Sequence, residues 1–234
     1  EDGQISQMND LMPAIRLTQG YYFGLGIDNY ENKFGIAGYH RDIYASGTYE
    51  DITSVFLLTT DTPLDNNSWV LSPTVAFDVD VLSGEVEPVK IAVGNDFHIL
   101  FQERRTDSNG ELRLGLNYVK GQPETGIWGW GKDVGDYASL ADFEVRVNED
   151  EDIILAAWRE GSGTNSLLIT WVTDKSWNEE DKEINSAPGM EHLMLVETKD
   201  EGVQIFYDSV LIGNEVILYG MISNENNEKE HSLS

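Results

Sequence analysis

The fold is decided by residues 88–120, which read PVKIAVGNDFHILFQERRTDSNGELRLGLNYVK. Residues 89–93 are rich in β-branched side chains and predict a strand, and the following Gly-Asn-Asp predicts a tight turn. Residues 97–103 predict a second strand, and a polar loop leads to a third strand over residues 111–119. This stretch is therefore expected to form a three-stranded β-meander.

The same order of strand, turn, strand, loop and strand recurs along the chain. It is found at residues 143–172 and 193–222 and, more loosely, at residues 22–59. Self-similarity at a fixed period is typical of repeat architectures. We therefore expect a single all-β domain over residues 1–234, with repeats at about 19–80, 81–138, 139–188 and 189–223.

A ring of these repeats explains both ends of the chain. The last repeat lacks a fourth strand, because residues 224–234 read as a polar tail, while residues 1–18 contain a spare strand at 12–18. Donation of that strand would close a small β-propeller of about four four-stranded blades and remove the exposed sheet edges. A fifth blade is expected if the loop at 42–51 hides a strand, and a β-sandwich is the alternative architecture.

The composition excludes several classes of partner. The chain has 15 Lys and Arg against 42 Asp and Glu, a formal net charge of −27, and no cysteine. A nucleic-acid backbone or an anionic membrane needs positive side chains, so neither is expected as a partner. No apolar run approaches the ~18 residues of a membrane span. No cofactor is expected, with calcium as the alternative, since the acidic turn at 148–152 lacks the spacing of an EF-hand loop.

Two short segments resemble a known motif. Asp65-Asn66-Asn67-Ser68-Trp69 and Thr173-Asp174-Lys175-Ser176-Trp177 resemble the Asp-box of sialidase-type propellers, although both lack its glycine. The resemblance implies a compact turn between the third and fourth strands of a blade. In that turn the Asp accepts hydrogen bonds from backbone N–H groups and the Trp packs between blades, so the role of the motif is structural.

The repeats are also similar to those of β-propeller lectins, including the fucose-binding type. That resemblance implies pockets lined by an aromatic residue, an Arg and a Glu. Aromatic rings stack on the apolar faces of sugars while polar groups fix the hydroxyls. The residues expected to bind ligand lie near the ends of second strands and in the Gly-rich segment near 128, and they are Tyr39, Arg41, Glu103, Arg105, Trp128, Trp130, Trp158, Arg159, Glu160 and Tyr207.

The expected function is therefore a non-enzymatic, extracellular lectin that binds a saccharide or glycoprotein. One alternative is a glycoside hydrolase or related propeller enzyme, which needs two carboxylates across a sugar. Asp42, Glu103 and Glu160 are the candidates for that pair. A second alternative is a scaffold whose acidic rim steers a basic protein partner.

Overall fold

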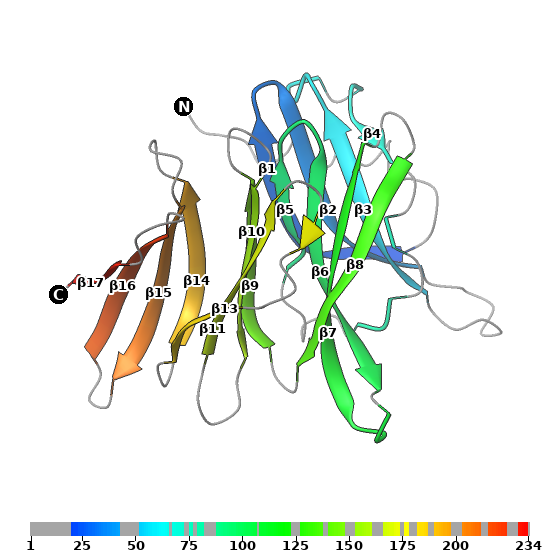
Figure 1. Ribbon diagram of the computed structural model, residues 1–234. Coiled ribbons are helices and arrows are strands. Elements are labelled where there is room, and N and C mark those ends of the chain that lie inside the picture. The colour runs from blue at the N-terminus through cyan, green and yellow to red at the C-terminus, as the bar shows by residue number, and fades with distance from the viewer. Residues whose placement is uncertain are drawn as a thin grey trace. The chain divides into compact units, whose positions relative to one another are not determined.

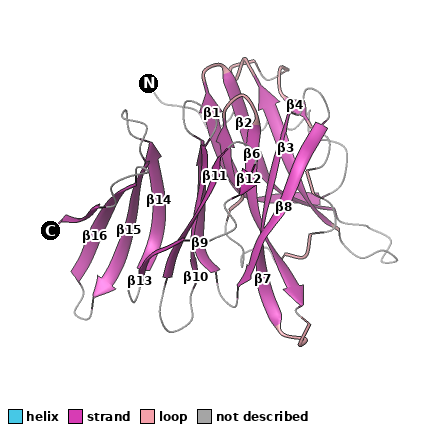
Figure 2. Ribbon diagram, viewed as in Figure 1, coloured by secondary structure: helices cyan, strands magenta, loops and turns pink. Residues whose placement is uncertain are grey.

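The structure is a computed structural model. It describes the backbone over residues 20–42, 52–65, 67–72, 75–76, 79–81, 88–106, 108–122, 127–137, 140–147, 153–160, 166–173, 176–177, 182–186, 190–197, 203–211, 215–223 and 229–233. It describes side chains over 22–41, 52–65, 67–72, 75–76, 79–81, 88–106, 108–121 and 143–147. The described residues form antiparallel sheets and no helix (Figure 2). They therefore include no helix long and apolar enough to span a membrane.

The first sheet has the order β1-β2-β3-β4 and is drawn in blue and cyan in Figure 1. Its strands are β1 (Gly20–Tyr30), β2 (Lys33–Asp42), β3 (Thr53–Thr60) and β4 (Val70–Leu71). The turn between β1 and β2 places Glu31 at a φ of 52°, in the left-handed region that tight hairpin turns require. The fourth strand of this sheet is interrupted, because β4 pairs with Leu58 and Thr59 whereas Ala76 forms a separate bridge with Val55.

The second sheet has the order β5-β6-β7-β8. Its strands are β5 (Lys90–Val93), β6 (Phe97–Thr106), β7 (Leu112–Gln122) and β8 (Ile127–Tyr137). Because β5 is much shorter than β6, their ladder ends where Lys90 pairs with Leu100. The residues of β6 beyond Leu100 must find other hydrogen-bond partners on that side.

The third sheet contains β9 (Leu140–Val147), β10 (Ile153–Glu160), β11 (Ser166–Thr173), β12 (Ser176–Trp177) and β13 (Lys182–Ser186). Its fourth position is again interrupted. Strand β12 pairs with the end of β11, while β13 pairs with its beginning.

The fourth sheet has the order β14-β15-β16-β17. Its strands are β14 (Met190–Glu197), β15 (Val203–Leu211), β16 (Glu215–Ser223) and β17 (Lys229–Leu233). Where the sequence predicts a polar tail, the structure has β17, which pairs with β16 from Ile222↔Lys229 to Leu218↔Leu233. The strand is hard to predict because a charged strand at a sheet edge needs no apolar face and is protected by its charge. The fourth sheet thus takes its last strand from its own end of the chain.

The chain divides into two compact units, residues 1–103 with 117–132 and residues 104–116 with 133–234. In the first unit β5 lies against β1 and β2, and in the second β14 lies against β9 and β10. Between β1 and β5, the amide of Val89 donates to the carbonyl oxygen of Gly24 at 2.9 Å, and the amide of Val93 donates to Asp28. Residue numbers rise together along both strands, so these two first strands run in the same direction.

Both faces of the first sheet carry apolar side chains. On one face Ala37, Tyr39, Val55 and Leu57 pack against residues of the second sheet such as Ile99. On the other face Phe56, Leu58 and Trp69 form a second cluster. A sheet that is apolar on both faces is typical of a structure with several stacked sheets.

The strands predicted at 89–93, 97–103 and 111–119 are present as β5, β6 and β7, and the three strands of the repeat predicted over residues 143–172 are present as β9, β10 and β11. The fourth strand expected in the first repeat is reduced to β4 and the bridge between Val55 and Ala76. The closing strand expected in residues 1–18 and the loop at 43–51 lie outside the described residues. The single domain and its repeat boundaries stay predictions.

Candidate functional site

Three residues of β1 lie against β5. Gly26 and Asp28 are two residues apart and share one side of the strand. Gly24 lies in a β-bulge between Phe23 and Gly26, at a φ of 58°, and its carbonyl oxygen accepts a hydrogen bond from the amide of Val89 at 2.9 Å. A Cβ on Gly26 would lie 2.1 Å from the carbonyl oxygen of Val89, so no other residue type permits this close approach. At the end of this row, Asp28 Oδ2 accepts a hydrogen bond of 2.9 Å from the amide of Val93.

The carboxylate of Asp28 is half-buried and fixed through one oxygen. Within the part of the chain whose side chains are described, Val93 is its partner. A carboxylate held in this way satisfies an edge amide of β5, which is a structural role. It also presents a second oxygen in a fixed orientation, which a nucleophile, a general base or a general acid requires.

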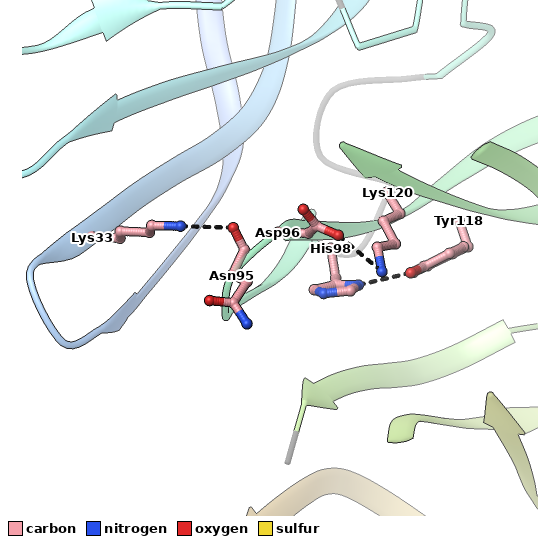
Figure 3. Close-up of polar contacts among 6 residues, drawn as sticks. All are labelled: Lys33, Asn95, Asp96, His98, Tyr118 and Lys120. Carbon is pink, nitrogen blue, oxygen red and sulfur yellow. Dashed lines mark hydrogen bonds and ion pairs between the residues drawn. The ribbon is translucent and has the colours of Figure 1, made fainter. Parts of the chain in front are cut away.

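Polar residues gather at the turn between β5 and β6 (Figure 3). Lys33 Nζ donates to the carbonyl oxygen of Asn95 at 2.7 Å, which ties this turn to the β1–β2 hairpin. Lys120 Nζ lies 2.9 Å from Asp96 Oδ2, and both side chains are mostly buried. Both lysines are therefore held by partners within the protein.

Below this ion pair, His98 Nδ1 lies 2.7 Å from the hydroxyl of Tyr118, and the two rings are stacked (Figure 3). His98 is 1% exposed and Tyr118 is 0% exposed. Burial and, to a smaller extent, the charge of Lys120 lower the pKa of His98 from 6.5 to about 3, and Asp96 acts in the opposite sense. Burial also raises the pKa of Tyr118. The pair is neutral at ordinary pH and lies out of reach of a ligand, which assigns it a structural role.

Tyr39 is part of the core. It is 0% exposed, and its hydroxyl binds the backbone of Gln102, donating to the carbonyl oxygen at 2.9 Å and accepting from the amide at 3.0 Å. A ring in this position is not available to stack on a sugar. The sequence-based assignment of Tyr39 to a ligand site does not fit this burial.

Three other predicted site residues have described side chains, and all are half-buried. Arg41 lies on β2 opposite Thr53, and Glu103 and Arg105 lie on β6. Arg105 lies across the backbone of Gly115, where a Cβ would meet its Nε at 2.5 Å. This packing uses the length of the Arg105 side chain within the sheet.

The remaining predicted site residues are placed by backbone alone. Trp128 and Trp130 belong to β8, and Tyr207 belongs to β15 opposite Tyr219. Trp158, Arg159 and Glu160 end β10, where Trp158 is opposite both Phe143 and Leu168. The side chains of these six residues lie outside the described ones, so their role as ligand contacts stays a prediction.

The structure brings together an aromatic group that the sequence analysis missed. Tyr22 and His40 are paired across β1 and β2, and their rings stack at a centroid distance of 4.4 Å. Phe56 meets Tyr22 edge-on at 5.2 Å. Since Tyr39 faces the core, its neighbour His40 must face the opposite side.

The Asp65–Trp69 segment forms the expected turn between β3 and β4. Asp65 Oδ1 accepts a hydrogen bond from the amide of Asn67 at 2.9 Å, and Ser68 Oγ lies 2.8 Å from the carbonyl oxygens of Thr62 and Asp65. Trp69 is 8% exposed and packs with Phe56 and Leu58. These contacts confirm the structural role that the resemblance implies for this segment.

At the second such segment, Thr173 pairs with Ser176 and Val172 with Trp177, again between third and fourth strands. Residues 174–175 lie outside the described ones, as does the acidic turn at 148–152 that was considered for calcium. Among the side chains that are described, no group of three or more His, Asp or Glu is arranged to hold a metal ion.

The fold is similar to those of solved β-propeller structures. Trypanosoma rangeli sialidase is 12% identical, and the match covers 91% of this chain and 38% of that chain with a TM-score of 0.52. CoXyl43, a GH43 β-xylosidase/α-arabinofuranosidase from a compost microbial metagenome, is 11% identical, with 92% and 78% covered and a TM-score of 0.50. No protein-family model and no curated protein sequence matches the chain.

These comparisons correct the expected function. The two solved structures described above are a sialidase and a xylosidase, so the expectation of a non-enzymatic lectin is wrong and the enzyme alternative is favoured. The burial of Tyr39 agrees with this correction, because it removes the aromatic member of one of the expected sugar pockets. At this level of identity the likeness shows the fold, and the reaction has to be argued from the site.

Proposed function

We propose that this chain is a small β-propeller that acts as a glycoside hydrolase, or forms the carbohydrate-active part of one. The observation that carries the proposal is the fold likeness to a sialidase and a xylosidase over more than nine-tenths of this chain. Four sheets whose strands follow one another along the chain support the propeller. So do the first strands β1 and β5, which lie side by side in the same direction, as in blades arranged around one axis.

Hydrolysis of a glycosidic bond needs two carboxyl groups, ~5–10 Å apart, on either side of the scissile bond. One acts as general acid, and the other acts as nucleophile or activates water. We assign Asp28 to this pair, because it lies on a first strand and Val93 holds its carboxylate by one oxygen.

Asp42 and Glu103, candidates from the sequence, are too far away to be the opposite carboxylate. Asp42 lies seven residues along β2 from Gly35, which pairs with Asp28, and Glu103 lies six residues along β6 from Phe97, which pairs with Val93, so each is about 20 Å from Asp28. The opposite carboxylate therefore comes from another part of the chain.

Glycoside hydrolysis by two carboxyl groups determines the class of ligand and the need for a cofactor. The ligand is a saccharide, and two-carboxylate hydrolysis needs no cofactor, so chelation of calcium is expected to leave the reaction unchanged. We also propose an extracellular location, where polysaccharides are encountered.

A screen of glycosides tests the proposal. The purified chain is incubated with aryl glycosides and polysaccharides, and released aglycone or new reducing ends are measured with and without a calcium chelator. Turnover of one glycan family that is lost in Asp28→Asn supports the proposal. Turnover that survives in Asp28→Asn moves the reaction to other carboxylates, and an inactive wild-type chain overturns the proposal.

A further inference from the structure

We propose that the glycan hydrolysed by this chain carries no carboxylate, sulfate or phosphate group. This inference rests on the proposed function and names its substrate class. The first observation is the formal net charge of −27. The potential of such a chain repels anionic ligands, over about 8 Å at physiological ionic strength, and lowers their concentration at its surface.

The second observation is the state of the positive side chains. Every lysine and arginine whose side chain is described takes part in an interaction within the chain. The contacts with named partners are Lys33 with the carbonyl of Asn95 at 2.7 Å, Lys120 with Asp96 at 2.9 Å, Arg113 with Glu111 at 2.8 Å and Arg146 with Glu144 at 3.7 Å. The others, which also have partners, are Arg41, Lys90, Arg104 and Arg105.

Within the part of the chain whose side chains are described, an anionic sugar would have to compete with these contacts for every positive group. Proteins recognise carboxylates and phosphates mainly through arginine forks and lysine ammonium groups. A sugar carboxylate that recruited Lys120, for example, would leave Asp96 without its ion-pair partner, so the exchange gains little. At the assigned site the charge of Asp28 itself would repel a second carboxylate. An uncharged glycan meets neither obstacle.

Matched polymers isolate the effect of charge. Polysaccharides that carry uronic acids are each tested beside the same polymer after its carboxyl groups have been reduced to alcohols, at low and at high salt. We expect the reduced polymer to be hydrolysed at least about tenfold faster at low salt, with the gap narrowing at high salt as repulsion is screened.

The outcomes separate the two proposals. Faster hydrolysis of the acidic polymer, or a rate on it that falls with salt, shows attractive cationic contacts and overturns this inference while the hydrolase function stands. Equal rates on both polymers also overturn it. If no polymer or aryl glycoside is turned over, the proposed function itself fails. Retention of each polymer in affinity electrophoresis then tests the charge preference by itself, and stronger retention of the acidic form overturns it.

Discussion

The hydroxyl of Tyr39 binds both backbone groups of Gln102, donating to its carbonyl oxygen at 2.9 Å and accepting from its amide at 3.0 Å. Gln102 lies on β6 beyond Leu100, where the ladder with β5 ends. The phenol of Tyr39 therefore takes the place of a missing strand residue and joins the first two sheets. This contact explains why a residue that resembles a ligand contact in the sequence is buried.

Tyr39→Phe keeps the ring and removes the hydroxyl. Because the amide and carbonyl of Gln102 then remain buried without this partner, we expect a loss of about 1–3 kcal/mol in the free energy of unfolding. Urea unfolding followed by tryptophan fluorescence measures the loss. A variant as stable as the wild type would contradict the role assigned to this contact.

His98 should make stability depend on pH. Its pKa is about 3 in the folded chain and near 6.5 when unfolded, so below pH 6.5 the unfolded chain takes up a proton that the folded chain does not. Stability therefore falls as the pH drops from 6.5 towards 3, by up to about 1.4 kcal/mol per pH unit from this group. Above pH 6.5 this contribution is constant.

The carboxylates titrate in the same window, so the comparison is with His98→Gln. The difference in unfolding free energy between wild type and variant should shrink as the pH is lowered from 6.5. A difference that stays constant across the window would show that His98 is not held neutral.

Gly26 is fixed by the close approach of β1 and β5. In Gly26→Ala the new Cβ would lie 2.1 Å from the carbonyl oxygen of Val89, so β5 must move and we expect a loss of more than about 3 kcal/mol or failure to fold. Gly110→Ala is the control, because Gly110 has a φ of 82° but no atom within 4 Å of its Cβ position. That variant should cost only about 1 kcal/mol. Similar losses in the two variants, measured by thermal unfolding, would contradict the close contact.

The turn at Asp65 is expected to stabilise the chain locally by holding Trp69 in place. Asp65→Ala removes the acceptor for the amide of Asn67, and we expect a loss of about 1 kcal/mol with a shift in tryptophan fluorescence as Trp69 loosens. Leu64→Ala, at a side chain that is 98% exposed in the same turn, should change neither. An Asp65→Ala variant as stable as the wild type would contradict this role and show that other contacts, such as those of Ser68, hold the turn.

Much of the fold could be predicted because most strands are rich in apolar residues and the turns between them are polar, as at residues 94–96 between β5 and β6. The edge strand β17 could not be predicted, because residues 229–233 read KEHSL and carry no apolar pattern. The interrupted β4 also depends on local pairing that sequence alternation does not reveal.

The candidate site was harder to predict. Tyr39 and His40 are adjacent and therefore face opposite sides, but both faces of this sheet are apolar, so alternation alone does not say which residue is buried. Asp28 is one of 42 acidic residues, and no motif in the sequence distinguishes it from the others. The signal available nearby in the sequence was the pair Gly24 and Gly26, since glycine inside a strand marks a bulge or a close backbone approach.

The central claim is tested most directly by the ratio of kcat/KM for wild type and Asp28→Asn on the best glycoside from the screen. Asp61→Asn, at an exposed carboxylate of the β3–β4 loop, is the matched control. We expect Asp28→Asn to fold and to lose at least about 100-fold in kcat/KM, while Asp61→Asn keeps wild-type activity. Equal activity in wild type and a folded Asp28→Asn would contradict the assignment of Asp28 as a catalytic carboxylate.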